Sequence, residues 1–327
     1  MMKKLFTVGL LGSLSQLALA NKIDLCVFDV AGTNGDIMNI IKDYTLAAKQ
    51  WDVEIRSKVY TSLVKAQQDF DQKRCNGLVA DNFSTKKYNN FMGTIGAARI
   101  IPNYNVARQV FQALGSPQLT GKFNTVSYEV VGFIPYGFAY LFTKDRSINS
   151  LEDLQGKRLG IMEADPSQSR MAQKVGMVPV PMNIDNVANK FRRGEFDLVP
   201  VPLIAYQAYD GKEILGEKGG VVNYPLAMVS MNVVLHKGGY PFDFGQKSRR
   251  WFAQQSVAMI NTVEAWQRHI PPHMFYGISK TDHTSYDRLT SQLRKEFIEN
   301  RTYDLAMINL VRNIRCRQEP EFIECKE

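Results

Sequence analysis

The sequence is poor in residues that commonly hold metals or act as nucleophiles, with four histidines and four cysteines among 327 residues. His269 and His273 have the spacing of a zinc pair, but Pro271 and Pro272 lie between them and no HExxH glutamate is present. No GxSxG motif occurs after residue 20, which argues against a serine hydrolase elbow. We therefore expect no metal, no cofactor and no enzymatic activity.

Long apolar runs and blocks of like charge are also scarce. After residue 20, no segment reaches the roughly 18 consecutive apolar residues that a membrane-spanning helix needs. Val130–Phe142 comes nearest, but it is short and contains Pro135, so we interpret it as a buried strand that crosses between lobes. No run of Lys and Arg is longer than two residues, so a solvated surface explains the basic excess better than a nucleic-acid site.

The N-terminus carries the one clear targeting signal. Residues 1–20, MMKKLFTVGLLGSLSQLALA, combine two lysines, an apolar stretch and small residues at Ala18 and Ala20. This pattern predicts a secretory signal peptide that is cleaved after Ala20. No cysteine follows directly, so we expect a soluble exported protein without a lipid anchor. The mature chain would carry a net charge of +6.

The four cysteines form an even set in a chain predicted to be exported, where oxidation is permitted. Cys316 and Cys325 enclose a short C-terminal segment, which favours a local disulfide. Cys26 would then pair with Cys75, because the two lie on strand candidates that are neighbours in a flavodoxin-like order. Two buried free thiols remain the alternative for these last two residues.

What the sequence has in abundance is the alternation of strand and helix. Leu151–Leu203 predicts strand, helix, strand, helix, strand, with Pro166 at the first helical position and Asp165 and Asp185 as helix caps. The expected strands here are 157–162, 178–181 and 196–199. The first third of the chain repeats the pattern, with strands expected at 22–30, 53–60 and 76–80 and helices at 37–51 and 63–72.

Two such units predict an α/β protein of two lobes, each a mostly parallel sheet flanked by helices. We expect lobe 1 to comprise residues 21–133 and about 230–270, and lobe 2 residues 134–229. Residues 221–236 would form a return strand between the lobes. C-terminal helices in 271–327 would pack across both lobes.

Ligands in open α/β sheets bind beyond the carboxyl ends of the strands, so candidate site residues are those at predicted strand ends and near the expected hinge. Helix capping is the alternative for Asp165, turn geometry for the Gly32–Gly35 segment, and core packing for each tyrosine. The candidates are Asp29, Asn34, Asp81, Asn82, Tyr136, Arg158, Glu163, Asp165, Ser167, Tyr206, Tyr224 and Asn232.

Several segments resemble a bacterial family, the extracytoplasmic solute-binding proteins of the TRAP (DctP) type, and within it a narrower AdeT-like group that also carries the label RND-type aminoglycoside-efflux proteins. The wider likeness lies in LQGKRLGI through GEFDLVPVP. The narrower one rests on KIDLCVFDVAGTNGDIMNIIKDY, YNNFMGTIGA, YEVVGFIPYGFAYLFTKDRSINSL, FGQKSRRWFA and IRCRQEPEFIECKE.

The resemblance implies a two-lobe periplasmic binding protein of the type II-like class. Such a protein captures a small molecule between its lobes, delivers it to membrane transporter subunits, and acts as a monomer. Alternatives are an efflux-associated or drug-tolerance accessory binder, or a periplasmic lyase or dehydratase on the same fold. TRAP proteins typically hold a carboxylate with an arginine in the first strand of the second lobe. Here Gly160 occupies that place and Arg158 lies two residues earlier, so a cationic or polyhydroxylated ligand is at least as reasonable as a carboxylate.

Overall fold

The computed structural model describes residues 21–326, apart from the side chain of Lys280. The predicted signal peptide lies outside the described residues. One ten-stranded mixed sheet runs through the molecule, with the order β2-β1-β3-β9-β4-β7-β5-β6 and with β8 and β10 beside it. The strands are β1 Asn21–Phe28, β2 Val53–Tyr60, β3 Gly77–Asp81, β4 Tyr128–Thr143, β5 Arg158–Met162, β6 Val178–Met182, β7 Leu198–Pro202, β8 Gly220–Val222, β9 Ala227–His236 and β10 Phe275–Tyr276.

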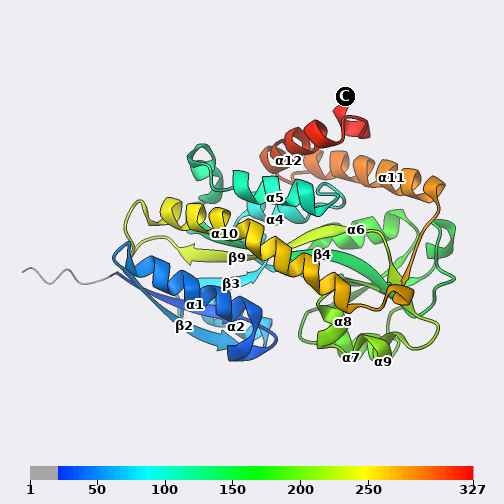
Figure 1. Ribbon diagram of the computed structural model, residues 1–327, viewed down its shortest axis with the longest axis horizontal. Helices are drawn as coiled ribbons and strands as arrows, with labels where there is room; N and C mark the ends of the chain where they lie inside the picture. The colour runs from blue at the N-terminus through cyan, green and yellow to red at the C-terminus, as the bar shows by residue number, and fades with distance from the viewer. Residues whose placement is uncertain (1–20, 327) are drawn as a thin grey trace, which may run out of the picture.

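The first half of the sheet is the parallel group β2-β1-β3. Helices α1 (Asp36–Lys49) and α2 (Leu63–Asp71) connect these strands, as the sequence pattern predicts. The buried side chains of α1 recur at helical spacing and face the interior of the protein. They are Ile37, Ile41, Tyr44 and Ala48. In Figure 1 this group forms the blue end of the molecule.

The second half is the parallel group β7-β5-β6. Its helices are α6 (Pro166–Lys174), α7 (Val187–Arg192), α8 (Ala205–Ala208) and α9 (Gly211–Leu215). Asp165 caps α6 as predicted, because its side chain accepts the backbone N–H of Ser167. The capping prediction for Asp185 is wrong: Asn186 precedes α7 without a side-chain cap, and Asp185 reaches α2 instead.

The two halves are joined by β4 and β9, which pair antiparallel along most of their length. Their register shifts between Val130 and Gly132 and again between Pro135 and Gly137. The expected return strand 221–236 is not continuous. It divides into β8 and β9, and Pro225 lies in the break, where its missing N–H cannot support a ladder.

Further helices cover the sheet. Helix α10 packs against β4 and α5, and α11 and α12 lie at the top of the molecule in Figure 1. The bounds are α3 Asn82–Thr85, α4 Asn90–Gly93, α5 Tyr104–Ala113, α10 Phe244–Trp266, α11 Lys280–Glu299 and α12 Leu305–Gln318. None of the helices within residues 21–326 has the length and apolar character that crossing a membrane requires.

Both predicted disulfides are present. Cys26 on β1 bonds to Cys75 just before β3, with 5.8 Å between the Cα atoms. Cys316 at the end of α12 bonds to Cys325, with a Cα–Cα distance of 5.5 Å. The first disulfide closes a long loop within the first half of the sheet, and the second holds the last residues against α12.

Candidate functional site

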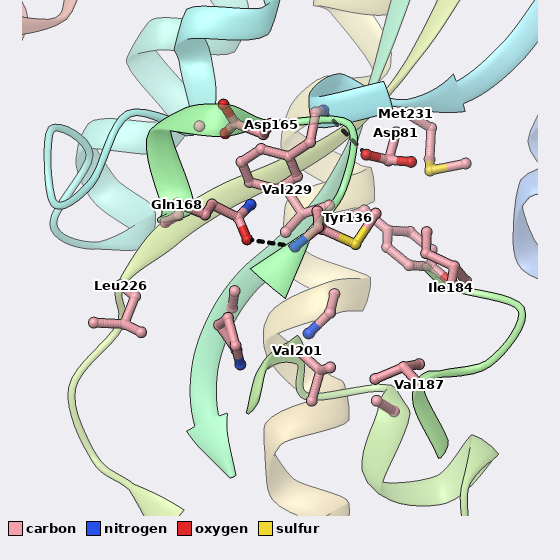
Figure 2. Close-up of a pocket in the computed structure, with 18 of the residues that line it drawn as sticks. Asp81, Tyr136, Asp165, Gln168, Ile184, Val187, Val201, Leu226, Val229 and Met231 are labelled. Carbon is pink, nitrogen blue, oxygen red and sulfur yellow. Dashed lines mark hydrogen bonds between the residues drawn. The ribbon is translucent and has the colours of Figure 1, made fainter. Parts of the chain in front are cut away.

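A cavity of about 150 Å³ lies where the two halves of the sheet face each other. The ends of five parallel strands contribute to its wall, namely Phe28 of β1, Asp81 of β3, Met162 of β5, Met182 of β6 and Val201 of β7. All five are at or near carboxyl ends, which is the edge where open α/β sheets bind ligands. Figure 2 shows the residues around this space.

The wall is mostly apolar. Met162, Met182 and Val201 approach from the second half, and Val229 and Met231 of β9 complete one side. Among the described residues that line the cavity, there is no lysine, arginine or histidine. The charged groups in the wall are the carboxylates of Asp29, Asp81 and Asp165.

Asp29 follows β1 and is fully engaged by the backbone. Its Oδ1 accepts the N–H of Ala31 at 2.9 Å, and its Oδ2 accepts the N–H of Met38 in the first turn of α1 at 3.0 Å. This arrangement places a carboxylate at the positive end of the α1 dipole. Asp29 therefore adds negative charge to the wall while both of its oxygens have partners.

Asp165 is held across the cleft. Its Oδ1 accepts hydrogen bonds from the backbone and the hydroxyl of Ser167. The same oxygen lies 3.3 Å from Nζ of Lys86, which follows the short helix α3 after β3. Lys86 also lies over the ring of Tyr303. The charge of Asp165 is thus balanced by a lysine outside the wall.

Asp81 differs from both. Its Oδ1 accepts the N–H groups of Phe83 and Ser84, each at 3.0 Å, and so caps the short helix α3. Its Oδ2 is buried and has no hydrogen-bond partner among the described residues. Burial raises the pKa of this carboxyl. Among the three wall carboxylates, Asp81 is therefore the one with an oxygen that has no hydrogen-bond donor among the described residues.

Neutral polar groups complete the wall. Gln168 accepts the backbone N–H of Met162 through Oε1, which leaves its amide group as a donor (Figure 2). Burial raises the pKa of Tyr136, and it raises the pKa of Tyr209 to about 12, so both phenols stay protonated. Gln168, Met162 and Tyr209 were not among the predicted site residues, although Met162 and Gln168 are the sequence neighbours of the predicted Glu163 and Ser167.

Five of the twelve predicted residues line the cavity: Asp29, Asp81, Tyr136, Asp165 and Ser167. Two others, Asn34 and Glu163, are exposed and outside the wall. The cavity wall therefore contains predicted residues from the ends of β1, β3 and β5 and from the segments that follow them, together with Tyr136 of β4.

Four more of the predicted residues are committed to packing. Asn82 accepts the N–H of Ser230, and Asn232 donates to Thr85. Tyr224 donates to Asp287 at 2.7 Å, and Tyr206 is buried beside Gly211. These side chains lie next to the strands of the site, but none of them lines the cavity.

Arg158 lies at the opposite end of β5 from the cavity. It is the first residue of the strand, and it forms an exposed pair with Asp197 through Nε at 3.2 Å and Nη2 at 2.6 Å. At Gly160, an added Cβ would lie 3.2 Å from Phe196 and Val199. Neither position offers an arginine to a ligand in the cavity.

A second link joins the two halves beside the cavity. Asp185, which follows β6, accepts the N–H of Leu63 at 2.9 Å and the hydroxyl of Ser62 at the start of α2. Together with the pair between Lys86 and Asp165, this contact bridges the cleft on two sides. The structure thus represents a form in which the halves are in contact around the cavity.

Solved structures of periplasmic solute-binding proteins share this fold. A TRAP periplasmic solute-binding protein from Ralstonia eutropha, with bound (S)-2-acetolactate, matches with a TM-score of 0.73 at 13% identity over 91% of this chain and 99% of that one. The ectoine-binding protein of the TeaABC TRAP transporter of Halomonas elongata matches with a TM-score of 0.69 at 10% identity, covering 90% and 98%. The fold is therefore that of two-lobed TRAP periplasmic binding proteins.

Sequence relatives narrow this class. The family model described as Solute-binding protein AdeT 1/2 matches residues 45–327. The "Probable solute-binding protein AdeT1" of Acinetobacter baumannii is 31% identical over 299 residues, which cover 91% of this chain and 98% of that protein. AdeT2 of the same organism is 30% identical over 234 residues, covering 72% and 98%. The chain belongs to the AdeT 1/2 family of solute-binding proteins.

Proposed function

We propose that this protein holds a small molecule in the cavity between the two halves of its sheet and delivers it to a membrane transporter. The observation that carries the proposal is the position of the cavity, at the carboxyl ends of parallel strands from both halves. The family is one of solute-binding proteins, and the H. elongata neighbour is named as part of a TRAP transporter.

The proposed lobes are residues 21–133 with about 230–270, and residues 134–229. They would open and close by hinge movement along β4 and β9, where the register shifts lie. The links from Lys86 to Asp165 and from Asp185 to Leu63 would break when the cleft opens. Residues 271–327 would pack across both lobes.

We further propose that the protein acts as a monomer in the periplasm after cleavage behind Ala20. The composition of residues 1–20 supports this location. Fractionation of the source cells and N-terminal sequencing test it. A mature chain that starts at Asn21 in the periplasmic fraction agrees with the proposal, and an uncleaved chain in the membrane fraction contradicts it.

The two carboxylates that a lyase or dehydratase would use as acid or base, Glu163 and Asp29, do not fit that role. Glu163 is exposed and outside the wall, and both oxygens of Asp29 accept backbone hydrogen bonds. For any effect on drug tolerance, we propose sequestration or delivery by this cavity, since no helix in residues 21–326 could cross a membrane.

Native mass spectrometry of the protein from its own periplasm tests the central proposal, because tight binders carry their ligand along. A thermal-shift screen of organic acids, amines, amino acids and aminoglycosides complements it. A ligand at 100 times its Kd stabilises the folded state by about 2.7 kcal/mol. A small molecule that co-purifies, or one class that raises Tm, supports solute binding; no adduct and no shift with any class counts against it.

A further inference from the structure

The three carboxylates in the cavity wall are not equivalent. Asp29 has two backbone partners, and Asp165 has Ser167 and the ammonium group of Lys86. Asp81 is 3% exposed, and its Oδ2 is without a partner among the described residues. A buried carboxylate oxygen without a donor is costly to the folded protein unless something else supplies one.

We infer that the cavity binds a small, largely apolar molecule with a single ammonium group, whose positive charge is balanced by the carboxylate of Asp81 in the wall. This inference rests on the proposed function and gives the class of its ligand. Such a ligand differs from a carboxylate in the sign of its charge, and from an aminoglycoside in having an apolar body.

The charge of the wall determines which sign of charge a ligand can carry. The described lining has three aspartates and no cationic side chain, and the lysine beside it, Lys86, already pairs with Asp165. A carboxylate ligand would enter next to Asp29 and Asp81 with no cation to compensate it. An ammonium group brings positive charge and up to three N–H donors, and its hydrogen bond to a carboxylate is charge-assisted.

The composition of the wall determines that the rest of the ligand is apolar. Met231 lies opposite Asp81 in the pairing of β3 with β9, and Phe83, Val229, Val201 and Met162 continue the surface. The hydroxyl groups of a sugar would lose their hydrogen bonds to water against these side chains. An apolar cavity of about 150 Å³ is known to accept benzene, so a benzylamine-sized molecule fits the volume.

Three probes of one shape and different charge test the inference. Binding of benzylamine, benzyl alcohol and benzoate to the purified mature protein is measured by calorimetry at pH 7. We expect benzylamine to bind at least about tenfold more tightly than benzyl alcohol, and benzoate to bind more weakly than both, because a charge-assisted hydrogen bond is roughly twice as strong as a neutral one. Kanamycin, a polyhydroxylated polycation, should bind more weakly than benzylamine.

The variant Asp81→Asn connects the preference to the residue. Its amide oxygen still caps α3 through Phe83 and Ser84, so the fold is retained. We expect the affinity for benzylamine to fall about tenfold and that for benzyl alcohol to stay unchanged. Asp197→Asn, which removes an aspartate that pairs with Arg158 away from the cavity, should leave both affinities unchanged.

Each other outcome has a defined meaning. Preference for benzoate or kanamycin over benzylamine overturns the inference while solute binding stands, and so does an amine preference that persists in Asp81→Asn. A co-purified apolar amine supports the inference, and a co-purified carboxylate overturns it. If no probe binds and no small molecule co-purifies, the proposed function fails together with the inference.

Discussion

At the scale of single residues, Asp81 is a cavity-lining carboxylate whose two oxygens have different surroundings. Its Oδ1 caps α3, whereas Oδ2 is buried without a partner. A residue retained only for the cap would function equally well as asparagine, which caps helices about as well as aspartate. The charge at this position therefore has a cost in the unliganded protein that the cap does not explain.

We predict that Asp81→Asn stabilises the unliganded protein at neutral pH by about 1 kcal/mol, the lower end of the usual cost of a buried polar group without a hydrogen-bond partner. The folded-state pKa of Asp81 is raised, so the folded wild type binds its proton more tightly than the unfolded chain does. Wild-type stability therefore falls as pH rises above the ordinary aspartate pKa. Hydrogen bonds from Ser84 and from the backbone N–H of Phe83 act in the opposite direction and lower the pKa of Asp81.

Urea denaturation of both proteins at pH 4 and pH 7.5 measures the effect. The advantage of Asp81→Asn should be larger at pH 7.5 than at pH 4. A variant that is less stable than the wild type by the same amount at both pH values would assign Asp81 an ordinary structural role.

A second buried charge has its partner. Nη1 of Arg249 on α10 lies 2.7 Å from Oε1 of Glu129 on β4 and also donates to the carbonyl of Val130. Arg249 is fully buried. The other carboxylate oxygen of Glu129 accepts the hydroxyl of Tyr240. Removing the charge from Glu129 would leave a buried guanidinium without its counter-ion.

We predict that Glu129→Gln lowers the free energy of unfolding by about 3–5 kcal/mol, the usual cost of breaking a buried pair from one side. Chemical denaturation measures the change. Asp24→Asn, at an exposed pair with Arg56, serves as the control and should have little effect. Equal losses in the two variants would refute a special role for the buried pair.

At the scale of elements, β4 combines length with irregularity. It spans both halves of the sheet, and its register against β9 shifts at two places. Gly137, at the second shift, has φ +96, and an added Cβ would lie 2.6 Å from Val263 of α10. Glycine is needed here for both backbone conformation and close packing.

We predict that Gly137→Ala destabilises the protein by about 1–3 kcal/mol, because the side chain is strained at this φ and meets α10. Gly121→Ala is the matched control: no atom lies within 4 Å of an added Cβ there, and it should have little effect. Thermal unfolding of both variants measures the difference. A Gly137→Ala protein as stable as Gly121→Ala would show that the strand relaxes around the substitution.

The sequence predicts regular elements better than it predicts the site. Parallel strands such as β5 are continuous apolar runs bounded by turns, and the Asp165–Pro166 start of α6 is a local signal. The placement of Asp185 depends on a partner far away in sequence, the backbone N–H of Leu63. Local patterns carry no information on such contacts.

For the cavity wall, the predicted strand ends include Asp29, Asp81 and Asp165, because the parallel strands of each half end at the cleft. Asn82 and Asn232 have the same polar chemistry, but they are turned toward Ser230 and Thr85. Which side of a strand end a side chain faces is set by the register of the neighbouring strand. Gln168 was missed since a glutamine within a helix has no signature of its own.

At the scale of the whole molecule, two polar links hold the halves together around an apolar cavity. The pair between Lys86 and Asp165 has side chains only 12% and 4% exposed. Asp185 caps α2 from the other half through Leu63 and Ser62. Neither Lys86 nor Asp185 lines the cavity. They can therefore affect closure without touching a ligand.

We predict that Asp185→Ala shifts the population toward an open form and weakens ligand affinity several-fold, because the closed, binding-competent form is populated less. The substitution removes two interlobe hydrogen bonds, each contributing about 0.5–1.5 kcal/mol in net terms. Small-angle X-ray scattering of the unliganded variant should show a larger radius of gyration than the wild type. Asp210→Ala, whose side chain makes no such link, serves as the control. Saturating ligand should restore the wild-type radius, since ligand binding favours closure; an affinity and a radius both unchanged in Asp185→Ala would mean that the apolar surfaces alone hold the halves together.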